Sequence, residues 1–136
     1  MTKNQIPYAK QSISNEDILA VEKVLRGDFL TQGSATKEFE TKLSKRTGAN
    51  YSIVVNSATS ALHLACLSLN LGVGDILWTS PNTYVASANV GIMCGAEVDF
   101  IDIDPKTHNM CVENLTKKLI IAKKSGKLPK IVMPVH

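Results

Sequence analysis

One stretch decides the fold of this chain: Tyr51-Ser52-Ile53-Val54-Val55-Asn56-Ser57-Ala58-Thr59-Ser60-Ala61-Leu62. Its first five residues are rich in β-branched side chains, which predicts a short buried strand over 51–55. Small polar residues follow over 56–60, and apolar residues at helical spacing continue over 61–67. A strand that passes through small residues into a helix is the first half of a βαβ unit.

The same alternation of strand and helix patterns runs to the end of the sequence. We expect strands over 76–79, 97–101 and 130–136, and helices over 81–94 and 112–124. Connections this short predict right-handed crossovers and a mostly parallel sheet. The expected fold class is therefore α/β, with three layers and helices on both faces of the sheet.

The first fifty residues lack this alternation and predict helices instead. Ser14 is a candidate N-cap with Asp17 three residues later, and the helix that follows should stop near Gly27. Ser34 and Gly48 are expected at the start and the end of a second helix. We therefore divide residues 1–136 into a helical segment, 1–50, and a segment of βα repeats, 51–136.

Composition excludes several classes of protein. The 136 residues are 44% hydrophobic and 20% charged, as in globular proteins, and no apolar run approaches the length of a membrane span. The sequence starts without the apolar stretch of a signal peptide, so we expect a cytoplasmic protein without a membrane partner. Three cysteines, Cys66, Cys94 and Cys111, lack a C-x-x-C spacing and predict buried thiols in a reducing compartment, with no disulfide and no metal site.

The net charge of +3 has a local origin. Without the six lysines between residues 117 and 130, nine basic residues face twelve acidic ones. That stretch has no interleaved aromatic residues and no nucleic-acid-binding motif, so we expect a solvated helix face and no nucleic-acid partner.

Ligands of parallel sheets bind beyond the carboxyl ends of the strands. Four places satisfy this rule: 56–60, 80–84, 102–104 and His136. In the first, the free N–H groups at a helix start, together with the hydroxyls of Ser57, Thr59 and Ser60, could bind a phosphate; simple capping of the helix explains the same residues. The motifs G-x-G-x-x-G and G-x-x-x-x-G-K-[ST] are both missing from the sequence, which disfavours dinucleotide and P-loop nucleotide sites.

The second place contains Tyr84, expected at the start of a helix on the same edge. Its ring could stack on a planar cofactor, or it is a half-buried surface tyrosine. The acidic side chains of Asp99, Asp102 and Asp104 fit a strand that ends in a turn better than a cation site, so we assign no metal.

Three blocks of the sequence resemble consecutive blocks of the DegT/DnrJ/StrS sugar aminotransferases: 56–64, 80–89 and 95–104. Tyr8, Leu30-Thr31-Gln32-Gly33 and Pro134-Val135-His136 extend the resemblance over nearly the whole chain. These are pyridoxal-phosphate enzymes of fold type I. The resemblance implies that residues 1–136 are the N-terminal part of the large domain of such a transferase.

The resemblance also implies roles for individual residues. Ala58 and Thr59 match positions that hold the phosphate of pyridoxal 5'-phosphate, and Tyr84 matches the ring that stacks on its pyridine. Nucleotide-sugar positions are matched by Tyr8, Asp28, Phe29, Leu30, Thr31 and Ser57.

An enzyme of this kind moves an amino group from glutamate to a UDP-linked 4-keto-6-deoxy sugar and works as a homodimer. The resemblance places the Schiff-base lysine beyond residue 136, so we assign no catalytic residue and expect the 136-residue chain alone to be inactive. Two alternatives stay open: a non-catalytic α/β module that binds a phosphate or nucleotide, and a family member that acts on another keto-sugar.

Overall fold

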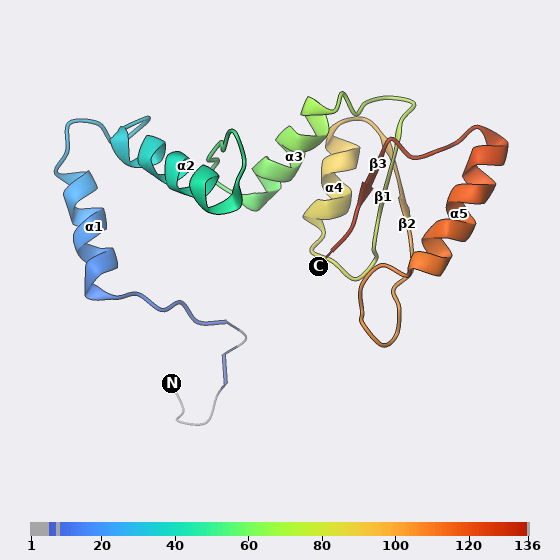
Figure 1. Ribbon diagram of the computed structural model, residues 1–136, viewed down its shortest axis with the longest axis horizontal. Helices are drawn as coiled ribbons and strands as arrows, with labels where there is room; N and C mark the ends of the chain where they lie inside the picture. The colour runs from blue at the N-terminus through green and yellow to red at the C-terminus, as the bar shows by residue number, and fades with distance from the viewer. Residues whose placement is uncertain (1–5, 8, 136) are drawn as a thin grey trace. The chain divides into compact units, whose positions relative to one another are not determined.

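The computed structural model describes residues 6, 7 and 9–135, which fall into two units divided between Val54 and Val55 (Figure 1). The first unit contains two helices. The second contains a parallel sheet and three helices. Each unit is described by itself.

Helix α1, Asn15–Leu25, begins at the predicted cap. The backbone N–H of Asp17 donates to Oγ of Ser14 at 3.2 Å, and the N–H of Ser14 donates to Oδ2 of Asp17 at 2.8 Å. This reciprocal pair is a capping box, which satisfies two N–H groups at the helix start. The helix ends at Leu25 with Arg26 as its C-cap, close to the predicted stop at Gly27.

Helix α2, Ser34–Thr47, starts one residue earlier than expected, because Gly33 and not Ser34 is its N-cap. A Cβ atom at residue 33 would lie 2.7 Å from the carbonyl oxygen of Phe29, so the close approach of these two backbone segments requires glycine. The predicted end is confirmed, since Gly48 takes a left-handed conformation with φ of 74°.

The strand predicted over 51–55 is wrong. These residues form no strand, and the side chains of Tyr51 and Ile53 are 89% and 79% exposed. The N–H of Val54 donates at 3.2 Å to Oε1 of Glu40, in place of a ladder partner. A β-branched run fits a pleated surface, but a strand also needs a neighbouring strand, and the described residues provide none here.

The sheet consists of β1, Ile76–Thr79, β2, Glu97–Phe100, and β3, Ile131–Met133. All pairs are parallel and the order is β2-β1-β3, as expected for two crossovers through helices. In this register Trp78 lies opposite both Asp99 and Val132. Strand β3 is shorter than the predicted 130–136 and ends just before Pro134, which has no N–H to donate to a ladder.

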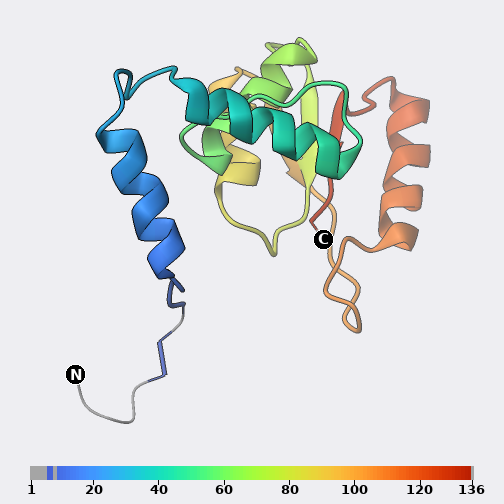
Figure 2. The same cartoon turned by 60° about the vertical axis from the view of Figure 1, so that its left-hand side comes forward.

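The helices of the second unit cover both faces of this sheet, which confirms the α/β class. Helices α3, Ala58–Ser68, and α4, Ala86–Met93, pack against each other on one side, and α5, Val112–Ser125, lies on the other (Figures 1 and 2). The predicted helix start at Pro81 is wrong, because α4 begins at Ala86. Its first turn closes where the N–H of Ser87 bonds to the carbonyl of Tyr84 at 3.0 Å, so residues 81–85 form a loop.

Strand β1 carries the core on both of its faces. Leu77, which is fully buried, packs toward α3 and α4 with Cys66 and Val90, whereas Trp78, 2% exposed, packs toward α5 with Ala122. This alternation is the two-residue period of a β-strand. The apolar residues of one short strand thus hold two helical layers.

Helix α4 approaches the sheet closely at Gly91. A Cβ atom there would lie 2.7 Å from Cγ2 of Val98 and 3.4 Å from Cβ of Leu77. Glycine at position 91 therefore allows α4 to pack this closely against strands β1 and β2. The loop before α4 is positioned by this packing.

Candidate functional site

The start of α3 offers free backbone donors. Ser57 is its N-cap, and the Ser57 side chain accepts the N–H of Ser60 at 3.1 Å, while the Ser57 carbonyl accepts the N–H of Ala61 at 3.1 Å. Within the described part of the chain, the N–H groups of Ala58 and Thr59 have no acceptor. These two adjacent donors lie at the positive end of an eleven-residue helix, where an anion is stabilised.

Two of the three hydroxyls expected at this place are occupied by the protein itself. Oγ of Ser57 lies 3.0 Å from Oγ of Ser60, and Ser60 donates to Oδ1 of Asn56 at 2.7 Å. The hydroxyl of Thr59 has no partner among the described residues. Thr59 is therefore the side chain best suited to add a bond to an anion, beside the N–H groups of Ala58 and Thr59.

Asn56 was given no role of its own by the sequence analysis. Its spacing of four residues from Ser60 is the signal that could have suggested their contact, since side chains at this spacing meet on one side of a helical turn.

Tyr84 lies in the loop between β1 and α4, and not at a helix start as predicted. Its ring is 77% exposed and its carbonyl accepts the N–H of Ser87. Helices α3 and α4 pack against each other, and the Tyr84 loop leads directly into α4 (Figure 1). Because the Tyr84 ring is so exposed, it is available for another planar group.

The strand end beneath this loop contains two buried hydroxyls. Thr79 donates through Oγ1 to the carbonyl of Met133 at 2.9 Å, which links the ends of β1 and β3. Ser80, which is 1% exposed, has no hydrogen-bond partner for its Oγ within the part of the chain that is described. The carboxyl end of β1 therefore carries polar side chains, but these side chains are buried.

The candidate sugar-binding residues divide between the two units. Asp28 and Phe29 line a cavity of about 410 Å³ between the end of α1 and the start of α2. Leu30 and Thr31 follow in the same loop but do not line it. Ser57 is the cap of α3 in the second unit.

Two residues named in the sequence analysis, Tyr8 and His136, lie outside the described residues.

The three aspartates considered for a cation already have protein partners. Asp99 pairs with Lys118 at 2.6 Å, Oδ1 of Asp102 accepts the N–H of Ile103, and Oδ1 of Asp104 accepts the N–H groups of Lys106 and Thr107. These backbone donors hold the pKa of Asp104 below its usual value. Over residues 6, 7 and 9–135, no group of three metal-ligating side chains comes together.

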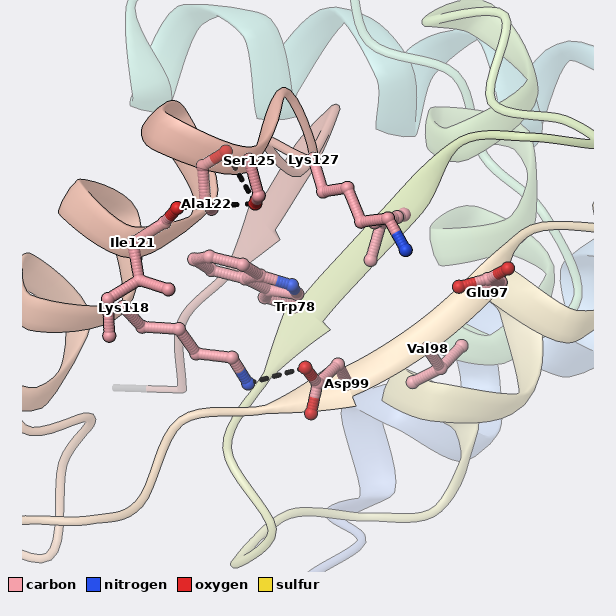
Figure 3. Close-up of a pocket in the computed structure, with 10 residues that line it drawn as sticks. Trp78, Glu97, Val98, Asp99, Lys118, Ile121, Ala122, Ser125 and Lys127 are labelled. Atoms are coloured by element: carbon pink, nitrogen blue, oxygen red, sulfur yellow. Dashed lines mark hydrogen bonds and ion pairs between the residues drawn. The ribbon is translucent and has the colours of Figure 1, made fainter.

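A second cavity, of about 320 Å³, lies between α5 and the strands β1 and β2 (Figure 3). Lys118 reaches across it over the ring of Trp78 toward Asp99, and it also donates to the carbonyl of Phe100 at 2.7 Å. The hydrogen bond from Lys118 lowers the pKa of Asp99. Because the Lys118 ammonium already has these partners, we assign no ligand to this cavity and attribute it to the packing of α5 on the sheet.

The prediction of buried thiols is confirmed for Cys66 and is wrong for Cys94 and Cys111, which are only partly buried. Burial, with a smaller contribution from the nearby Cys94, raises the pKa of the Cys66 thiol. A helix that could span a bilayer is not found among the described residues.

Comparison with known proteins identifies relatives over nearly the whole chain. The model of the DegT/DnrJ/EryC1/StrS aminotransferase family matches residues 11–136. The UDP-4-amino-4,6-dideoxy-N-acetyl-beta-L-altrosamine transaminase of Campylobacter jejuni is 44% identical over 98 residues, which are 72% of this chain and 26% of that protein.

Two further relatives extend this result. The UDP-4-amino-4-deoxy-L-arabinose--oxoglutarate aminotransferase of Shewanella sediminis is 31% identical over 136 residues, the whole of this chain and 34% of that protein. The PLP-form of the putative sugar aminotransferase Spr1654 from Streptococcus pneumoniae superimposes with a TM-score of 0.78 at 35% identity, over 82% of this chain and 29% of that one.

The chain therefore spans about a third or less of the length of the relatives it matches. Within that span the sequence blocks, the parallel sheet and its helical layers agree with those of sugar aminotransferases. The chain belongs to the DegT/DnrJ/EryC1/StrS aminotransferase family.

Proposed function

We propose that the natural protein containing this chain is an aminotransferase that uses pyridoxal phosphate to transfer an amino group from glutamate to a UDP-linked 4-keto-6-deoxy sugar. The observation that carries the proposal is the start of α3, where the N–H groups of Ala58 and Thr59 are unpaired in the described structure. A dianionic phosphate fits two such donors at a helix N-terminus. The PLP-form of a family member supports the choice of cofactor.

The residues present fit this cofactor in two respects. Ala58 has a small side chain that lets a phosphate approach the backbone, and the free hydroxyl of Thr59 supplies a third donor. The exposed ring of Tyr84 offers a flat apolar surface for the pyridine. When bound, pyridoxal phosphate supplies an electron sink for breaking bonds beside the amino nitrogen, while these residues hold and orient it.

The choice of sugar rests on what the relatives share. The names of the Campylobacter and Shewanella enzymes both contain a UDP-linked sugar with an amino group at carbon 4, and the second also names oxoglutarate, the product of glutamate in such a transfer. The 44% identity to the altrosamine enzyme favours a 4,6-dideoxy sugar with an N-acetyl group. As the pathway we propose pseudaminic acid biosynthesis. We propose that the protein is a homodimer, as the family resemblance implies, and that it is cytoplasmic, as the start of the sequence led us to expect.

We assign nucleotide-sugar contacts to the residues that the family resemblance implies, taking each unit by itself. In the first unit, Asp28 can accept hydrogen bonds from hydroxyl or imide groups, and the Phe29 ring, 75% exposed, can stack on a uracil base. Leu30 and Thr31 complete this loop. In the second unit, the position of Ser57 matches a nucleotide-sugar contact of the family.

The experiment uses the whole natural protein that contains this chain. Incubation with glutamate, pyridoxal phosphate and a UDP-linked 4-keto-6-deoxy-N-acetylhexosamine should release 2-oxoglutarate and the 4-amino sugar in equal amounts. If the protein binds pyridoxal phosphate but aminates no UDP-keto-sugar, the proposed substrate is wrong and another keto-sugar replaces it. If it binds only phosphate or nucleotide, a non-catalytic binding module replaces the aminotransferase.

A further inference from the structure

The hydroxyl protons at the start of α3 can be assigned by counting. Each serine hydroxyl has one hydrogen to donate. Ser60 gives its hydrogen to Oδ1 of Asn56 at 2.7 Å, so the 3.0 Å contact between the two serine hydroxyls must use the hydrogen of Ser57. The protons therefore run in one direction, from Ser57 to Ser60 to Asn56.

This direction determines what the Ser57 oxygen does. Having donated its hydrogen to Ser60, Oγ of Ser57 keeps its lone pairs for the N–H of Ser60, which it accepts at 3.1 Å. The cap then occupies the third N–H of the helix, and the N–H groups of Ala58 and Thr59 remain for a ligand. The amide oxygen of Asn56 sets the direction of these hydrogen bonds, because it is the last acceptor in the series.

We infer that Asn56 is a positioning residue for the cofactor phosphate and acts through Ser60 and Ser57 without touching the cofactor. This inference rests on the proposed function. Without the Asn56 amide, the nearest acceptor for the Ser60 hydroxyl is Oγ of Ser57, at 3.0 Å. Ser57 would then accept the hydroxyl of Ser60 and no longer donate to it, so its oxygen loses the polarisation that strengthens its bond to the N–H of Ser60. The cap weakens, and the turn that presents Ala58 and Thr59 loosens.

The test compares two cofactor forms that differ only in the phosphate. In the whole natural protein, we expect Asn56→Ala to raise the Kd of pyridoxal phosphate about threefold to tenfold, as for one lost hydrogen bond, and to leave the Kd of pyridoxal unchanged. Ser60→Ala should give the same selective loss, and adding Asn56→Ala to it should give no more. Asn114→Ala, an exposed asparagine on α5, is the matched control.

The possible outcomes separate the inference from the function on which it rests. If the unaltered protein prefers pyridoxal phosphate to pyridoxal and Asn56→Ala keeps that preference, the positioning role is wrong. Equal loss for both ligands, or independent losses in the double variant, also overturns it, and Ser60→Ala decides the matter if Asn56→Ala does not fold. If the unaltered protein shows no preference for the phosphate form, the proposed phosphate site fails, and the role of Asn56 with it.

Discussion

The ammonium of Lys118 lies 4.9 Å from the centre of the Trp78 ring. The same ammonium pairs with Asp99 at 2.6 Å, so one side chain of α5 contacts the neighbouring strands β1 and β2. Lysine is suited to this position because its long, flexible side chain brings one ammonium within reach of both the ring face and the carboxylate.

Lys118→Met should therefore lower the free energy of unfolding by about 1 kcal/mol, the sum expected for a partly exposed ion pair and a cation–π contact. Urea unfolding followed by Trp78 fluorescence measures the change. Lys117→Met, one position away on the exposed side of α5, should change it far less. Equal effects of the two substitutions would mean that Lys118 contributes only as a member of the lysine cluster.

The two hydroxyls at the end of β1 should respond in opposite ways. Thr79→Val leaves the carbonyl of Met133 without its side-chain donor and should cost about 1 kcal/mol of unfolding free energy. Ser80→Ala removes a buried hydroxyl that has no partner in the described structure, so stability should stay constant or rise. Thermal unfolding of both variants checks the pair, and a clear loss on Ser80→Ala would show that its hydroxyl has a partner.

Stability should fall in acid. Hydrogen bonds from Lys118 and Lys130 hold the pKa values of Asp99 and Asp75 below their ordinary value. The unfolded chain therefore takes up these protons first, so the stabilisation is complete above the unfolded-state pKa near ~3.9 and is lost as the pH falls through the lower folded-state values. Urea midpoints should be level from about pH 7 to about pH 5 and should drop below about pH 4.

A variant that carries both Asp75→Asn and Asp99→Asn tests this assignment. It should be less stable than the unaltered protein at neutral pH, because the ion pairs with Lys130 and Lys118 are gone. Its stability should also decline less steeply in acid. An unaltered acid slope would assign the pH dependence to other carboxylates.

Thr59→Val tests the hydroxyl that the structure leaves free beside the α3 start. Loss of a hydrogen bond to a charged phosphate should weaken pyridoxal phosphate binding by about 1.5–3 kcal/mol, which is tenfold or more. Calorimetric titration measures it, and Thr116→Val on α5 serves as the control because its hydroxyl bonds within its own helix. Unchanged affinity would remove the Thr59 side chain from the site.

Tyr84 should contribute through its ring and not through its hydroxyl. Tyr84→Phe should keep the affinity for pyridoxal phosphate, whereas Tyr84→Ala should weaken the binding of pyridoxal phosphate and pyridoxal alike, by about threefold to tenfold. This loss for both ligands contrasts with the selective loss expected for Asn56→Ala. A Tyr84→Ala protein with normal affinity for both would exclude stacking.

The sequence predicted those elements whose signals are local. The Ser14–Asp17 capping box, the left-handed Gly48 and the strands β1 and β2 follow from side chains near them in the chain. The same holds for Ser57, whose side chain caps α3. The predictions of helix ends succeeded because the deciding contacts lie within about one helical turn, whereas the two strands were predicted from the composition of their own residues.

The failed strand over 51–55 and the unforeseen Ser80 hydroxyl concern contacts between distant parts of the chain, whereas the wrong helix start at Pro81 is a local failure. Residues 51–55 have the composition of a strand, but composition says nothing about which strand would pair with them. Pro81 is typical of a helix start, yet α4 begins only at Ala86, where the backbone bonds of Tyr84 and Val85 close the first turn. The unpaired hydroxyl of Ser80 has no sequence signal, because it depends on what surrounds a buried strand end.

The opposite placement of Leu77 and Trp78 has a consequence for how the second unit comes apart. Because neighbouring residues of β1 anchor different apolar clusters, loss of β1 exposes both clusters at once, and neither helical layer can open by itself without solvating one face of this strand. The amides of β1 should therefore exchange with solvent deuterium only through global unfolding, more slowly than those of β2 at the edge of the described sheet. The two layers are expected to melt in a single cooperative transition.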